Sequence, residues 1–147
     1  MARPSVWGVT PRQRVEAECA RRGEAAVVAG CVSLLRGLPV DSPLLFALGG
    51  PFARVVLEDG PEQRNQYWRR VWGARGLLYA WDDEAPGAVV DALADEHWRV
   101  REMAAKVVAR RIIGAALDDV APLRDDLVPR VRAAAQRALI AITAAGA

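Results

Sequence analysis

The feature that most constrains the fold of this chain is a residue pattern that occurs twice near its C-terminus. The pattern is Asp-x4-Val-Arg, and its copies lie 31 residues apart, at Asp95, Val100 and Arg101 and at Asp126, Val131 and Arg132. Each copy continues into an alanine-rich segment whose apolar residues recur at helical spacing. Repetition at about 30 residues is typical of stacked helical hairpins, in which each hairpin buries its apolar side against its neighbours.

The composition favours one globular domain. The chain has 147 residues and 52% of them are hydrophobic, which is enough for a core and too much for a disordered chain. Its formal net charge is +2, so the whole chain has no strong attraction to nucleic acid or to an acidic membrane. Every basic residue except Lys106 is an arginine. Arginine, unlike lysine, binds anions in a bidentate way and stacks on aromatic rings.

The two cysteines predict neither a disulfide framework nor a metal site. Cys19 and Cys31 lie in helical segments, and the sequence offers no set of further ligands at zinc-binding spacing. Buried free thiols are typical of a reducing cytoplasm. The N-terminus has no apolar core of signal-peptide length, and apolar runs such as 25–32 are far shorter than the roughly 20 residues of a membrane span. We therefore expect a cytoplasmic protein without metal or cofactor.

Helix signals divide the first part of the chain. Residues 1–9 are expected to form a loose arm that Trp7 tucks onto the body. Thr10, Pro11 and Gln13 form a capping-box pattern that predicts a helix to about residue 22. A second helix is predicted over 24–35. Ser42 followed by Pro43 is the same kind of signal and predicts a short helix over 44–48.

The later helices follow in the same way. Residues 52–57 fit one or two helical turns, and Gly60-Pro61 predicts the start of a long aromatic helix over 62–81. Further helices are predicted over 86–94, 98–113, 118–125 and 129–144, with a tight turn at 95–97. No strand alternation competes, so the class is all-α. We expect one domain over 1–147, with N-terminal helices over 10–60 and repeats over 61–145, arranged as a short right-handed α-solenoid of antiparallel hairpins.

The segment that surrounds the first copy of the pattern resembles a HEAT repeat, of the short kind also found in phycobilin-lyase-type proteins. It reads Leu-Ala-Asp-Glu-His-Trp-Arg-Val-Arg-Glu-Met-Ala-Ala over 93–105. The resemblance implies that the repeated acids and arginines form a ladder between neighbouring repeats, with structural roles for Asp95, Arg101, Asp126 and Arg132. At the turn, Asp95 is also placed to cap the following helix. HEAT-like repeats are mostly scaffolds, so the resemblance implies a binding function and no particular activity.

A degenerate third copy lies upstream at a shift of 30 residues. It aligns Asn65, Trp68, Arg69, Ala74 and Leu78 with Asp95, Trp98, Arg99, Ala104 and Val108. In this alignment the Val-Arg pair is replaced by Arg70-Val71. The match to the pattern is therefore incomplete in this copy.

Basic residues are predicted to gather on the concave face, which the second helix of each hairpin lines in a solenoid. The candidate binding residues are Arg69, Trp72, Arg75, Arg99, Lys106, Arg110, Arg130 and Arg137. In the alignment Arg69, Arg99 and Arg130 form one column, and acids concentrate in the turns. Such a face would bind an anionic partner, either an acidic protein segment or a nucleic-acid backbone. The alternative is a solvated surface with weak local ion pairs.

Aromatic residues raise the possibility of a nucleic-acid partner more directly. Trp68, Trp72 and Tyr79 recur on one helical stripe. They can fill the junction between repeats, or they can form a stacking platform for bases beside Arg69 and Arg75. The latter arrangement has a weak resemblance to alkyl-purine DNA glycosylases built from HEAT-like repeats, in which Trp81, Asp82 and Asp83 would also take part.

No catalytic motif accompanies these features. His97 is the single histidine and has no nucleophile at a readable spacing. Gly49-Gly50-Pro51 lacks the spacing of a phosphate loop, and Asp82-Asp83-Glu84 lacks that of a calcium loop. The last helix is apolar on nearly every face from Ala138 onward, which predicts coverage by another part of the protein or a homodimer through this helix. A non-catalytic protein-binding module is the preferred interpretation.

Overall fold

The computed structural model describes residues 8–146, so Trp7 and most of the predicted arm lie outside the described residues. Within 8–146 the chain is helical and contains no strand, which confirms the predicted all-α class. None of the described helices is long and apolar enough to cross a membrane.

The first two helices begin and end as the local signals predict. Helix α1 (Pro11–Arg22) starts at a complete capping box, in which the Thr10 hydroxyl accepts from the Gln13 amide and the Gln13 side chain accepts from the Thr10 amide. Gly23 follows with φ +94°, a conformation that favours glycine, and α2 (Glu24–Leu35) begins directly after it.

The third helix starts one residue earlier than the proline signal suggests. Its N-cap is Asp41 and not Ser42, because the Asp41 carboxylate accepts the Leu44 amide at 2.8 Å and is itself held by two hydrogen bonds from Arg22. Helix α3 (Ser42–Gly49) then leads into η1 (Gly50–Phe52) and α4 (Ala53–Leu57). The predicted helical turns over 52–57 are thus present.

The long aromatic helix predicted over 62–81 is wrong at both ends. Helix α5 covers only Tyr67–Gly76, and turns occupy the residues before it. Asp59 explains the late start, because its carboxylate accepts the Asn65 amide at 2.8 Å and the Gln66 side-chain amide at 2.9 Å and so holds this segment in a loop. After α5 the chain turns at Leu77 and continues to α6 (Pro86–Ala92).

The last helices match their predicted positions closely. Helix α7 spans Trp98–Arg111 and ends at Ile112, whose φ of +51° lies in the left-handed region just before Gly114. The short elements η2 (Gly114–Ala116), α8 (Leu117–Val120) and η3 (Ala121–Asp125) precede α9 (Pro129–Gly146).

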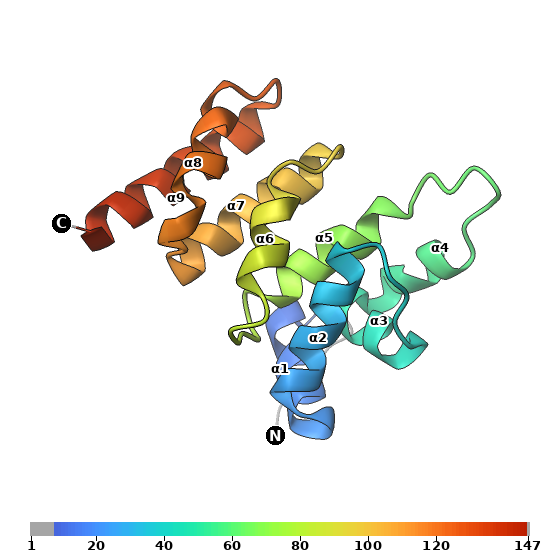
Figure 1. Ribbon diagram of the computed structural model, residues 1–147. Coiled ribbons are helices and arrows are strands. Elements are labelled where there is room, and N and C mark those ends of the chain that lie inside the picture. Colours follow the sequence, from blue (N-terminus) through green and yellow to red (C-terminus); the bar gives the residue numbers. More distant parts are fainter. Residues whose placement is uncertain (1–7, 147) are drawn as a thin grey trace.

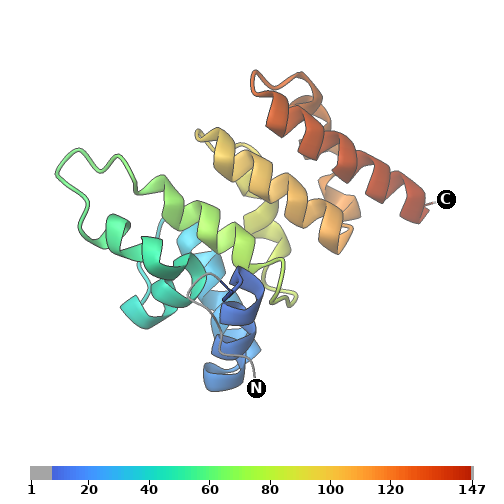
Figure 2. The ribbon, with the colours of Figure 1, turned by 180° about the vertical axis from the view of Figure 1, so that it is seen from behind.

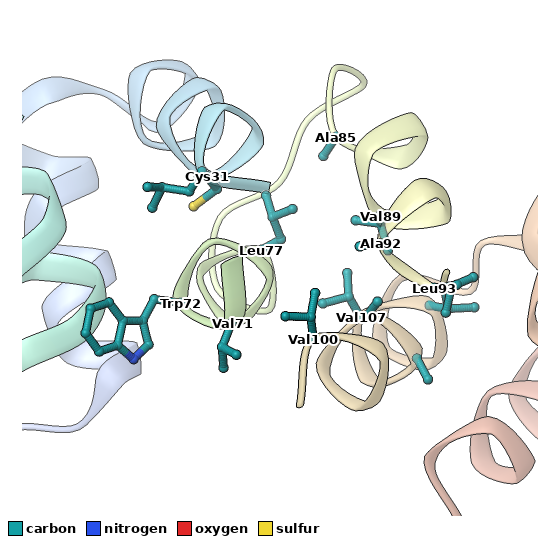
Figure 3. Packing of buried hydrophobic residues seen from close by; sticks show 14 of the residues in the cluster. Cys31, Val71, Trp72, Leu77, Ala85, Val89, Ala92, Leu93, Val100 and Val107 are labelled. Carbon is teal, nitrogen blue, oxygen red and sulfur yellow. The ribbon is translucent and has the colours of Figure 1, made fainter. Parts of the chain in front are cut away.

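The helices pack in a row that explains which surfaces remain open. Helices α5, α7 and α9 lie side by side, with α6 and α8 packed along them (Figure 1) and the open side of the row visible from behind (Figure 2). Helices α1, α2 and α3 all contact α5. Leu77, directly after α5, meets Val89 of α6 and Val107 of α7 in the core, and all three side chains are fully buried (Figure 3). The open surface therefore belongs mainly to α7 and α9.

Candidate protein-binding surface

Arginine and tryptophan side chains from the first turns of α5, α7 and α9 stack on one another. The Arg99 guanidinium carbon lies 5.1 Å from the centre of the Trp68 ring and 4.6 Å from that of the Trp98 ring. Arg130 lies 5.2 Å from the Trp98 ring. We call these four residues the Arg–Trp stack. Since α5, α7 and α9 each contribute to it, the stack depends on the packing of all three helices.

The two arginines of the stack differ in what their N–H groups bind. Arg130 donates from Nε to Glu102 at 2.8 Å and from Nη2 to the same carboxylate at 3.1 Å, which is a bidentate pair. The Arg99 guanidinium makes neither an ion pair nor a hydrogen bond with any residue of the described part of the chain. It is half-buried between two indoles. Stacking therefore orients its donors, and none of the described residues accepts from them.

Positive charge dominates the rest of this surface. Glu102 is the single acid within the described helices α5, α7 and α9, and it is buried and committed to Arg130. Lys106 lies 3.9 Å from the same carboxylate, at the limit of an ion pair. Arg110 and Arg137 are exposed and have no carboxylate partner among residues 8–146. The face of α7 and α9 is therefore basic although the chain is nearly neutral.

Three predicted binding residues lie elsewhere or act differently. Trp72 is 3% exposed, and its ring packs against Gly49 of α3, so the prediction of a surface role for Trp72 is wrong. Arg75 is half-buried and donates to the Leu48 carbonyl at 2.7 Å, which ties α5 to α3. Burial lowers the pKa of the Arg75 guanidinium.

Arg69, which was predicted to share a column with Arg99 and Arg130, makes its side-chain hydrogen bond to a residue of its own segment. Its Nε donates to the Gln66 side chain at 2.7 Å. The residue of α5 that contacts Arg99 is Trp68 instead. The structure thus brings Arg99, Arg130 and Lys106 together through the Trp98 ring and the Glu102 carboxylate. Arg110 and Arg137 lie further along α7 and α9, whereas Trp72 and Arg75 contact residues of α3.

A second set of arginines connects each helix of the row to the turn that precedes the next helix of the row. Arg101 donates from Nε to Asp126 at 2.8 Å, and Arg70 donates from Nε to Asp95 at 2.7 Å. We call these two ion pairs rungs. In both rungs the acid follows the arginine by 25 residues. The sequence alignment missed Arg70 because its shift of 30 placed Val71 opposite Arg101. The 31-residue shift of the other two copies aligns Arg70 with Arg101 and would have found it.

The acids of these rungs also shape the turns that contain them. Asp95 accepts the His97 amide at 2.9 Å, and Asp126 accepts the Val128 amide at 3.0 Å. Asp95 does not cap α7 as predicted, because the N-cap is His97, whose Nδ1 accepts the Arg99 amide at 3.2 Å. Burial raises the pKa of Asp126, but the hydrogen bonds from Arg101 and Val128 outweigh it, so the pKa is lowered overall.

Arg101 and Arg132 each bind a carbonyl six positions earlier. Arg101 donates from Nη1 to the Asp95 carbonyl at 2.9 Å, and Arg132 donates from Nη1 to the Asp126 carbonyl at 2.6 Å. All four residues predicted as a ladder therefore take part in the turn network. Arg132 has no carboxylate partner within the described residues.

The His97 ring lies between the aromatic rings of α5 and the start of α7. It stacks on Tyr67 with the ring centres 3.6 Å apart and the planes 7° apart. Burial lowers the pKa of His97, and the charges of Arg99, Arg70 and Arg101 act in the same direction against the opposing effect of Asp95. No group of three or more acid, His or Cys side chains within 8–146 is arranged to hold a metal ion.

Comparison of the chain with protein-family models, with curated proteins and with solved structures gives no match.

Proposed function

We propose that the chain is a short HEAT-like solenoid and acts as a non-catalytic protein-binding module. Two observations support the architecture: α5, α7 and α9 form a row, and the Arg–Asp rungs recur between successive turns with the same 25-residue separation. In this proposal the basic face of α7 and α9 is the inner, ligand-binding side.

The proposed ligand is an acidic segment of a partner protein. The observation that carries this proposal is the Arg99 guanidinium, which is held by Trp68 and Trp98 without an anionic partner among the described residues. Lys106, Arg110 and Arg137 extend the positive charge along the face. Charge complementarity of this kind accelerates association and selects acidic partners over neutral ones.

Nucleic acid is the second candidate, and the same exposed cations favour it. Phosphates would be attracted to Arg110 and Arg137 as strongly as carboxylates. Recognition of bases by stacking has less support, because the Trp68 ring stacks on Trp72 at 6.2 Å and lies against Arg99, and the Trp98 ring is occupied by Arg99 and Arg130. A base would have to displace one of these partners.

Fluorescence anisotropy with two probes tests the proposal. One probe is a labelled 12-residue peptide rich in Asp and Glu, and the other is a short labelled DNA duplex. Arg110→Glu with Arg137→Glu reverses two exposed charges on the face, while Arg54→Glu with Arg64→Glu reverses two charges of side chains that are 74% and 78% exposed elsewhere.

We expect the peptide to bind, the first pair of changes to weaken binding at least tenfold, and the second pair to have little effect. Duplex binding that falls steeply with salt, without peptide binding, would instead establish the second candidate. If neither probe binds at low salt, the proposed function is wrong.

The homodimer through α9 remains a prediction. Ile140 is 58% exposed and borders a shallow hollow formed with Arg124, Gln136 and Leu139. An apolar side chain in this position would be covered in a dimer. Sedimentation equilibrium over a wide concentration range tests it, and a constant monomer mass would contradict it.

A further inference from the structure

The arginines that lie over tryptophan rings provide an internal comparison. Arg130 lies over Trp98 and binds the Glu102 carboxylate with two N–H groups. Arg111 lies 5.1 Å from the Trp81 ring and donates from Nε to the Leu77 carbonyl at 3.0 Å. In both cases the stacked guanidinium has an oxygen acceptor supplied by the protein.

Arg99 has the same kind of environment without the acceptor. Its guanidinium contacts two indoles, and no acceptor from residues 8–146 lies within hydrogen-bonding distance. Stacking restrains the side chain, so little conformational entropy remains to be lost when an anion binds. The two rings also cover part of the half-buried side chain, and a charge-assisted hydrogen bond is stronger where less water competes for it.

We infer that Arg99 is the receptor for one carboxylate of the bound acidic segment, an Asp or Glu side chain that makes a bidentate pair equivalent to the Arg130–Glu102 pair. This inference rests on the proposed function and specifies it. The two pairs would lie side by side, because both arginines contact the Trp98 ring.

The neighbouring cations explain how the rest of the segment is held. Lys106 and Arg110 follow Arg99 by seven and eleven residues on α7, which places all three on one stripe of the helix. At the rise of an α-helix these separations are about 10 Å and about 16 Å along the axis. The stripe therefore attracts further acids of the segment, while Arg99 supplies the directional contact.

A charge-conserving substitution separates the directional contact that Arg99 makes from the general attraction by positive charge. Arg99→Lys keeps the positive charge and removes the planar fork and its stacking. Arg54→Lys is the matched control, because the Arg54 side chain is 74% exposed and belongs to α4, outside this surface. The probe is the Asp- and Glu-rich peptide, acetylated and amidated at its ends, together with variants in which one acid at a time is replaced by its amide.

We expect Arg99→Lys to weaken peptide binding at least tenfold and Arg54→Lys to change it less than twofold. One amide replacement should weaken binding to the wild-type protein much more than the others, and the Arg99→Lys variant should lose that preference. In the unaltered protein, the Nε–H resonance of Arg99 should shift on titration with peptide, which provides a measurement that does not depend on a variant.

The possible failures are distinguishable. If Arg99→Lys binds as the wild type does and all amide replacements are equivalent, this inference is overturned, while loss of binding in the Arg110→Glu and Arg137→Glu variant would still support the proposed function. If the wild-type protein binds no acidic peptide, the proposed function is overturned together with the inference.

Discussion

The rung between Arg101 and Asp126 is expected to contribute substantially to stability. The Asp126 side chain is 7% exposed and that of Arg101 is 18% exposed, so the pair is largely removed from water. It has two hydrogen bonds, of 2.8 Å and 3.1 Å, and Asp126 also accepts the Val128 amide. Replacement of Asp126 by alanine leaves a half-buried guanidinium without its carboxylate and an amide without its acceptor.

The expected loss can be estimated from these contacts. Removal of one partner of a buried ion pair costs 3–5 kcal/mol, and the partial exposure of Arg101 places Asp126→Ala at about 3 kcal/mol. For a chain of this size that loss lowers the melting temperature by about 6–12 °C. Asp126→Asn keeps an oxygen for the Val128 amide and removes the charge, so its loss should be smaller, at about 2 kcal/mol.

Chemical denaturation monitored by tryptophan fluorescence gives the free energies of unfolding. Asp125→Ala is the control, because Asp125 is exposed and should change stability by less than about 0.5 kcal/mol. The folded-state pKa of Asp126 is lowered, so its contribution is present above the unfolded pKa and disappears as the pH falls through the folded value. Wild type and Asp126→Asn should therefore converge in acid. Equal stability of the two proteins at neutral pH would refute this account of the rung.

Two further predictions concern packing and pH. A Cβ at Gly73 would lie 2.8 Å from the Cys31 carbonyl oxygen and 2.9 Å from the Leu34 Cβ, so Gly73→Ala should lower the free energy of unfolding by about 2 kcal/mol. A Cβ at Gly87 would come no nearer than 3.7 Å to the Arg36 side chain, so Gly87→Ala should leave the free energy of unfolding unchanged or raise it. Because the folded-state pKa of His97 is lowered, the unfolded chain binds its proton more readily, and stability should fall as the pH drops below about 6.5. His97→Asn, which keeps an N-cap acceptor, should lose less stability than the wild type between neutral and mildly acidic pH; an identical pH dependence would contradict the role of His97.

Sequence signals predicted those elements whose ends are determined by neighbouring residues. Thr10, Pro11 and Gln13 act within one helical turn, so the start of α1 was predictable from the chain alone. The late start of α5 was not, because it depends on where Asp59 meets Asn65 and Gln66 across a loop.

The candidate surface was predictable in the same partial way. Helical spacing places Arg99 and Lys106 on one stripe, but the burial of Trp72 depends on Gly49, which lies in a different helix. The contact of Arg99 with Trp68 likewise depends on how closely α5 and α7 pack. Such contacts between distant residues are outside the reach of periodicity, which describes each helix separately.

The turn network and the Arg–Trp stack are parts of one arrangement. Asp126 binds the Val128 amide two residues before Arg130, and Asp95 binds the amide of His97, the residue before Trp98. The turns held by the rungs therefore determine where α7 and α9 begin, and with this the positions of Trp98 and Arg130. In this way largely buried ion pairs outside the Arg–Trp stack still help to position the stacked residues. A row of helices whose turns are held by such rungs would thus present its basic face at a fixed spacing, which is the property that the proposed binding module for an acidic segment requires.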